Sequence, residues 1–165
     1  MSGGMIAIAG RPGSGKTSLM VDLVGEFTRR GLAVSTMMRM ADPASIDRPG
    51  KDSFRHRAAG AEEVLVTSAQ RWALIHGGGA GEHDPLARMA AVDLVIVEGM
   101  ASPGSPMIEV HRLETAAGQP PLGRDDPAIL VVVSDAPLEG LDQPVIDLGD
   151  APAVADFIIA RLGLA

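Results

Sequence analysis

The sequence has 165 residues, of which 46% are hydrophobic and 21% are charged, a composition typical of one globular domain with a buried core. Its net charge of −7 disfavours broad binding to nucleic acid or to an anionic membrane. The absence of cysteine excludes a disulfide framework and thiolate metal sites. No apolar run approaches membrane-spanning length and the first residues lack the order of a signal peptide, so we expect a cytoplasmic protein.

A strand, a glycine-rich turn and a helix are predicted at the start of the chain. An apolar run at residues 5–9 leads into residues 10–17, which fit the phosphate-loop pattern G-x-x-x-x-G-K-[ST]. Backbone N–H groups of such a loop and the following helix N-terminus point at bound phosphates. Helical periodicity continues to residue 30, before Gly31. The predicted phosphate-binding residues are Gly10, Arg11, Pro12, Gly13, Ser14, Gly15, Lys16, Thr17 and Ser18.

Two of these side chains have predicted chemical roles. Lys16 is expected to reach the terminal phosphates, and the Thr17 hydroxyl is expected to bind Mg²⁺. The chain has only two lysines, Lys16 and Lys51, against twelve arginines. A lysine retained in such a chain indicates a position that favours a compact ammonium over a planar guanidinium.

A second strand is predicted at residues 32–38, followed by a long loop at 39–52 and a short helix to residue 59, capped by Asp52 or Ser53. The loop carries a charged cluster that includes Asp47 and Lys51. Lys51 is a candidate for binding phosphate or an anionic substrate, and Asp47 for holding a metal through water or positioning an attacking water. The alternative is that these charges are solvated side chains of a turn.

Two strand-like runs, at residues 63–68 and 71–76, are separated by two residues and predict a hairpin, so we expect a mixed sheet. A flexible loop at 77–84 and a short helix at 85–91 follow. Residues 93–97 read as a buried strand that ends at Glu98. A carboxylate at the carboxyl end of such a strand is the usual metal-organising acid beside a phosphate loop. The alternative is that nearby backbone N–H groups satisfy the hydrogen-bonding capacity of the Glu98 carboxylate.

The remaining elements are a turn at 100–106, strands at 107–112, 128–134 and 145–148, a surface loop at 113–127, and a closing helix at 153–162. Asp135 follows the buried strand at 128–134 and is a candidate for accepting the N–H groups of guanine. The Asn-Lys pair of the corresponding GTPase motif is absent, and capping of a helix or turn is the alternative role. We predict an α/β, P-loop NTPase-like three-layer fold, with a mostly parallel, mixed twisted sheet flanked by helices, in a single domain over residues 1–165.

Six blocks of sequence, in order, resemble the molybdopterin-guanine dinucleotide biosynthesis protein B (MobB) family over nearly the whole chain. They are GRPGSGKTSL, IDRPGKDSFRHRAAGAEEVLVTSAQRWAL, DLVIVEGM, PMIEVHR, VVVSDAPL and DLGDAPAVADFI. The resemblance implies a dimeric P-loop protein that binds GTP with Mg²⁺, hydrolyses it weakly and assists a MobA-like guanylyltransferase in attaching GMP to molybdopterin. It also implies that Asp47 and Glu98 serve metal and water, and that Asp135 lies near the guanine.

This chain departs from the family pattern in two places. Family members typically have a Lys-His pair after the second strand, where this chain reads MMRMADPAS, and a lysine where it has Met107.

Two alternative functions remain open. One is a small-molecule phosphotransferase or ligase, with Lys51, Asp52 and residues 55–57 forming the acceptor site, and the other is a nucleotide-dependent adaptor that does not hydrolyse. If the protein is an enzyme, the candidate catalytic residues are Lys16, Asp47 and Glu98.

Overall fold

The computed structural model describes residues 3–39, 47–77, 85–99 and 104–164. The chain divides into two compact units, one formed by Met1–Arg39 with Ala91–Ala165 and the other by Met40–Ala90. The sequence-based expectation of a single domain stays a prediction. Parts of the predicted loops, namely residues 40–46, 78–84 and 100–103, lie outside the described residues.

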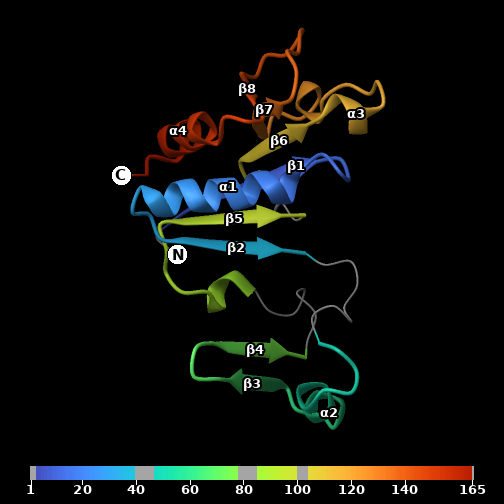
Figure 1. Cartoon of the computed structure of the whole chain (residues 1–165), viewed down its shortest axis with the longest axis vertical. Coiled ribbons are helices and arrows are strands. Elements are labelled where there is room, and N and C mark those ends of the chain that lie inside the picture. Colours follow the sequence, from blue (N-terminus) through green and yellow to red (C-terminus); the bar gives the residue numbers. More distant parts are fainter. Residues whose placement is uncertain (1–2, 40–46, 78–84, 100–103, 165) are drawn as a thin grey trace. The chain divides into compact units, whose positions relative to one another are not determined.

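The first unit contains a six-stranded sheet in the order β2-β5-β1-β6-β7-β8 (Figure 1). Every neighbouring pair in this sheet is parallel, so the carboxyl ends of the strands lie at one edge. The strands are β1 (Gly4–Gly10), β2 (Val34–Met38), β5 (Leu94–Glu98), β6 (Met107–His111), β7 (Ile129–Ser134) and β8 (Val145–Asp147).

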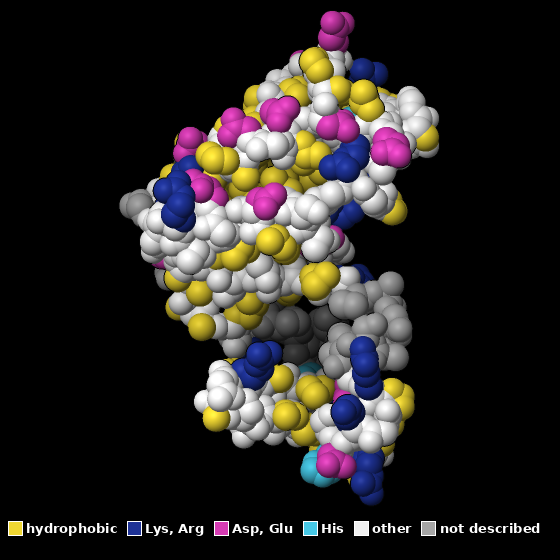
Figure 2. All heavy atoms as spheres, viewed as in Figure 1, with side chains coloured by type: hydrophobic (Ala, Val, Ile, Leu, Met, Phe, Trp, Pro, Cys, Tyr) yellow, Lys and Arg dark blue, Asp and Glu magenta, His cyan; other side chains and the backbone are white. Residues whose placement is uncertain are grey.

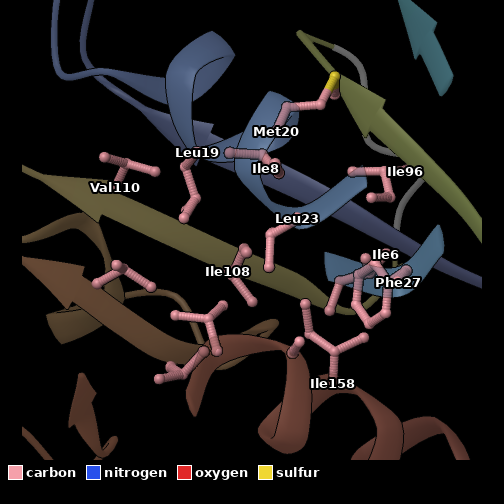
Figure 3. Packing of buried hydrophobic residues seen from close by; sticks show 14 of the residues in the cluster. Ile6, Ile8, Leu19, Met20, Leu23, Phe27, Ile96, Ile108, Val110 and Ile158 are labelled. Carbon is pink, nitrogen blue, oxygen red and sulfur yellow. The ribbon is translucent and has the colours of Figure 1, made fainter. Parts of the chain in front are cut away.

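Two long helices, α1 (Lys16–Arg29) and α4 (Ala151–Leu162), pack on one another and share a hydrophobic core with the sheet. Leu23 and Phe27 of α1 are completely buried, as are Ile108 of β6 and Ile158 of α4, and their side chains meet in the core (Figure 3). Burial of an apolar side chain of this size stabilises the folded state by about 1.5–3 kcal/mol. This packing fixes the beginning of α1 at the carboxyl edge of the sheet.

Two short helical elements in the first unit lie where the sequence predicted a surface loop. They are α3 (Leu113–Ala116) and the 3₁₀ turn η3 (Leu122–Arg124). Both are too short to carry a strong periodic signal, which is why the sequence pattern did not indicate them. Among the described residues, no helix has the length and apolar character needed to cross a membrane.

The second unit consists of α2 (Asp52–Ala58), an antiparallel hairpin of β3 (Glu63–Thr67) and β4 (Trp72–His76), and the 3₁₀ turn η2 (Pro85–Arg88). Glu63 forms an ion pair with Arg88, and its Oε1 lies 3.2 Å from His76 Nδ1.

The α/β P-loop NTPase-like fold class is confirmed, because helices pack on a sheet of six parallel strands. The hairpin was expected to make the main sheet mixed, but it forms a separate two-stranded sheet. The expected helix cap was also wrong. Lys51 occupies the N-cap position of α2, where no side chain caps the helix, and Asp52 and Ser53 lie within it.

Candidate functional site

The glycine-rich loop connects the end of β1 to the beginning of α1, as the sequence predicts. Gly10, Gly13 and Gly15 have φ values of 143°, 79° and 100°, which side chains rarely permit. A Cβ on Gly10 would lie 2.5 Å from the Val110 carbonyl oxygen and 2.8 Å from Ser14 Oγ. The loop therefore requires glycine at this position because the backbone of β6 passes directly beside it.

The Lys16 side chain forms hydrogen bonds with the backbone of its own loop. Its Nζ donates hydrogen bonds to the carbonyl oxygens of Gly10, at 3.1 Å, and Arg11, at 2.9 Å. An ammonium has three N–H donors, so two of them hold the loop and one is left over. Ser14 Oγ is buried in the same loop and has no hydrogen-bond partner among the described residues. A half-buried cation and an unsatisfied hydroxyl in the turn before the N-terminus of α1 suit an anionic ligand.

Thr17 and Glu98 meet beside the loop, although 81 positions separate them in the sequence. The Thr17 hydroxyl lies 3.1 Å from Glu98 Oε1 and 3.0 Å from Oε2. The contact arises because β5 is the parallel neighbour of β1, with Ile8 in register with Glu98. Among the described residues, Glu98 is thus partnered by the Thr17 hydroxyl, and not by backbone N–H groups as the alternative interpretation proposed.

The oxygens of Thr17 and Glu98 have the chemistry that Mg²⁺ prefers, since this ion takes hard oxygen ligands in octahedral geometry. Within the described part of the chain, no group of three or more histidine, cysteine, aspartate or glutamate residues forms a metal site.

The opposite side of the loop contacts the segment that follows β6. Arg11 Nη2 donates to the Pro120 carbonyl oxygen at 3.0 Å. The completely buried Glu109 carboxylate accepts hydrogen bonds from the backbone N–H groups of Leu122 and Gly123, both at 2.9 Å. Glu109 thereby fixes the turn that carries Pro120. Sequence reasoning assigned no role to Glu109. Its position between the apolar residues Ile108 and Val110 of a predicted strand could have indicated a buried carboxylate with specific partners.

Asp135 lies just beyond β7 at the same edge of the sheet. Its Oδ1 accepts the Leu113 N–H at 3.1 Å, and its Oδ2 lies 3.9 Å from Arg112 Nε. Asp135 thereby satisfies the first backbone N–H of α3, although the N-cap residue of that helix is Arg112. The side chain is also partly exposed and lines a pocket with Leu138 and Val145, so it retains oxygen surface for a ligand.

Asp47 and Lys51 belong to the second unit. The Asp47 side chain is only 5% exposed, accepts the Ser53 hydroxyl at 3.2 Å and forms an ion pair with Arg57 Nε at 2.9 Å. These contacts hold Asp47 against α2. Lys51 is exposed at the N-cap of the same helix. Their predicted roles toward metal, water and phosphate stay predictions.

Comparison with known proteins connects this geometry to one family. The family model described as molybdopterin guanine dinucleotide synthesis protein B (MobB) matches residues 5–135. The molybdopterin-guanine dinucleotide biosynthesis adapter protein of Haemophilus influenzae is 34% identical over 158 residues, which cover 93% of this chain and 86% of that protein. The protein of the same name from Escherichia coli is 32% identical over 161 residues, 94% of this chain and 91% of its own length.

Solved structures agree with the sequence comparison. A crystal structure of molybdopterin-guanine biosynthesis protein B matches with a TM-score of 0.70 and 26% identity, over 96% of this chain and 99% of that one. A MobB homologue from Bacillus stearothermophilus matches with a TM-score of 0.67 and 25% identity, over 98% and 99% of the two chains. The glycine-rich loop, the parallel sheet and these matches show that the chain belongs to the MobB family.

Proposed function

We propose that this protein is an adapter of molybdopterin guanine dinucleotide biosynthesis that binds GTP with Mg²⁺ at the loop of residues 10–17. Two neighbouring contacts carry the proposal: the Lys16 ammonium lies on the Gly10 and Arg11 carbonyls of the glycine-rich loop, and the hydroxyl of the next residue, Thr17, lies against the Glu98 carboxylate. The names of the relatives, which are adapter proteins, support the role in this biosynthesis.

In this proposal the loop N–H groups and Lys16 hold the phosphates, while Thr17 and Glu98 hold the metal ion. When bound, Mg²⁺ supplies positive charge against the phosphate oxygens. Thr17 and Glu98 already contact one another, so they need little rearrangement to share a ligand. We propose weak hydrolysis only, with Lys16 stabilising the charge on the phosphates.

Asp135 is the proposed guanine contact. A carboxylate can accept the N1–H and N2–H of guanine together, and adenine has no matching pair of donors. The Leu113 N–H holds Asp135 in place through one oxygen, which still has a second lone pair. The pocket beside Asp135 opens at the carboxyl edge of the sheet, where nucleotides bind in folds of this type.

The proposed partners are a second copy of the chain and a MobA-like guanylyltransferase, with molybdopterin as the acceptor of GMP. Support for the homodimer comes from the hairpin of the second unit. Leu65, Trp72 and Leu74 are 60%, 70% and 40% exposed on it, and hydrophobic side chains are visible on the surface of this unit (Figure 2). Leu65 pairs with Leu74 across the hairpin, and Trp72 lies two residues from Leu74, so the three share one face.

The proposal is tested by measuring how nucleotides change the binding of this protein to the guanylyltransferase of its own organism. Surface plasmon resonance is run with GTP and Mg²⁺, with GDP and Mg²⁺, and without nucleotide. Association should strengthen with GTP, and Lys16→Ala should remove the strengthening, while Arg161→Ala on the exposed end of α4 serves as the matched control.

Two results would contradict the adapter role. The first is association that does not depend on nucleotide in the wild-type protein. The second is transfer of phosphate from GTP or ATP to a small metabolite by the protein alone, which is the outcome expected of a phosphotransferase or ligase.

A further inference from the structure

The PMIEVHR block ends in Arg112, the residue that follows strand β6. Strand β6 lies between β1 and β7, with Val110 in register with Gly10 on one side and His111 in register with Ser134 on the other. Arg112 follows directly. It therefore leaves the sheet at the carboxyl edge, between the glycine-rich loop and Asp135.

The Arg112 guanidinium lies against the loop. A Cβ built on Gly15, the residue before Lys16, would be 3.5 Å from Arg112 Nη2 and 3.9 Å from Cζ. Arg112 Nε is buried and has no hydrogen-bond partner among the described residues, although the side chain as a whole is 39% exposed. A guanidinium has five N–H donors, so this cation has unused binding capacity beside the loop.

A purely structural role does not account for these donors. The distance of 3.9 Å to Asp135 Oδ2 is too long for a hydrogen bond, and partly exposed ion pairs of this kind contribute little to stability. Asp135 is held independently by the Leu113 N–H at 3.1 Å. Arg112 is thus not required to position the carboxylate that we assign to guanine.

We propose that Arg112 binds the phosphate chain of the nucleotide from the side of Asp135, opposite the metal oxygens of Glu98. This inference rests on the proposed nucleotide site. The planar guanidinium presents paired donors that match phosphate oxygens, and its charge adds to that of Lys16. Because the contact is to phosphate, Arg112 contributes affinity without contributing base selectivity.

The experiment is a calorimetric titration of the full chain with GTP and with inosine triphosphate, which lacks the 2-amino group of guanine, both with Mg²⁺. Arg112→Ala should weaken both nucleotides by the same factor, about 10- to 100-fold, as expected for the loss of a hydrogen bond to a charged group. Arg112→Lys should recover part of the loss. Arg161→Ala is the matched control and should leave both affinities unchanged.

Two outcomes would overturn the proposal. Unchanged affinity in Arg112→Ala would show that the guanidinium does not touch the nucleotide. A selective loss of GTP over inosine triphosphate would show that it acts through Asp135. Arg112→Gln provides a second neutral variant if the alanine variant does not fold.

The titrations also separate this inference from the proposed function. If wild-type protein binds no GTP, or Lys16→Ala binds it normally, the proposed nucleotide site fails and the role of Arg112 fails with it. If wild-type and Lys16→Ala behave as proposed and the Arg112 variants bind normally, only the role of Arg112 is overturned.

Discussion

Replacing Glu98 with glutamine tests the metal half of the proposed site. The change removes one negative charge while keeping the size of the side chain and one oxygen that the Thr17 hydroxyl can reach. A single hydroxyl proton is donated to only one of the two carboxylate oxygens, at 3.0 or 3.1 Å, so the variant retains an equivalent hydrogen bond. The free energy of unfolding should therefore change by about 1 kcal/mol or less.

The effect on nucleotide binding should be larger and should require the metal. Loss of a carboxylate beside a bound metal typically lowers metal affinity about 10- to 100-fold, so the strengthening of GTP binding by Mg²⁺ should shrink by that factor. The assay is titration of GTP into Glu98→Gln in Mg²⁺ and again in EDTA. Affinity in EDTA should match that of the wild-type protein or exceed it, because a negative charge near the phosphates is gone.

Glu62→Gln, a change of the same chemistry at an exposed position of the second unit, is the control. It should alter neither titration. An equal loss of affinity in Mg²⁺ and in EDTA would refute the reasoning, because Glu98 would then support the loop through the Thr17 contact alone. Full retention of the Mg²⁺ effect would refute it as well.

Two further predictions concern stability and assembly. Hydrogen bonds from Arg29 and Arg30 lower the pKa of Glu26 from 4.5 to about 2, so its ionised form stabilises the fold above pH 4.5 and this contribution is lost as the pH falls toward 2. At pH 7, Glu26→Gln should therefore unfold at a lower urea concentration than the wild-type protein. The difference between the two urea midpoints should shrink as the pH falls from 4.5 to about 2, and a difference that stays constant would contradict the assignment. If the hairpin face forms the proposed homodimer, Trp72→Ser should lower the mass measured by sedimentation equilibrium toward that of a monomer, and a mass equal to that of a wild-type dimer would exclude this face as the interface.

The sequence predicted most of the elements because their signals are local. The glycine pattern of residues 10–17 and the helical spacing of Leu19, Leu23 and Phe27 need no knowledge of distant residues. The destination of the hairpin was not predictable in this way. Alternation of side chains identifies β3 and β4 as strands, but it carries no information on which sheet they join.

The residues of the candidate site also divide into those with a local sequence signal and those whose contacts leave none. Thr17 and Glu98 were both candidates because each has a recognisable position, one in the loop motif and one at a strand end. The partners of Glu109 and Asp135 are instead backbone N–H groups of Leu122, Gly123 and Leu113, in a stretch predicted as loop. Any residue except proline supplies a backbone N–H, so such contacts leave no trace in the sequence.

The central claim is that the loop of residues 10–17 binds GTP, and calorimetric titration of the wild-type chain with GTP and with ATP tests it most directly. In the presence of Mg²⁺, GTP should bind more tightly than ATP, and Lys16→Ala should weaken GTP binding strongly because the loop loses its ammonium. Binding of ATP as tight as that of GTP would contradict the assignment of guanine, and normal binding of GTP by Lys16→Ala would contradict the site itself.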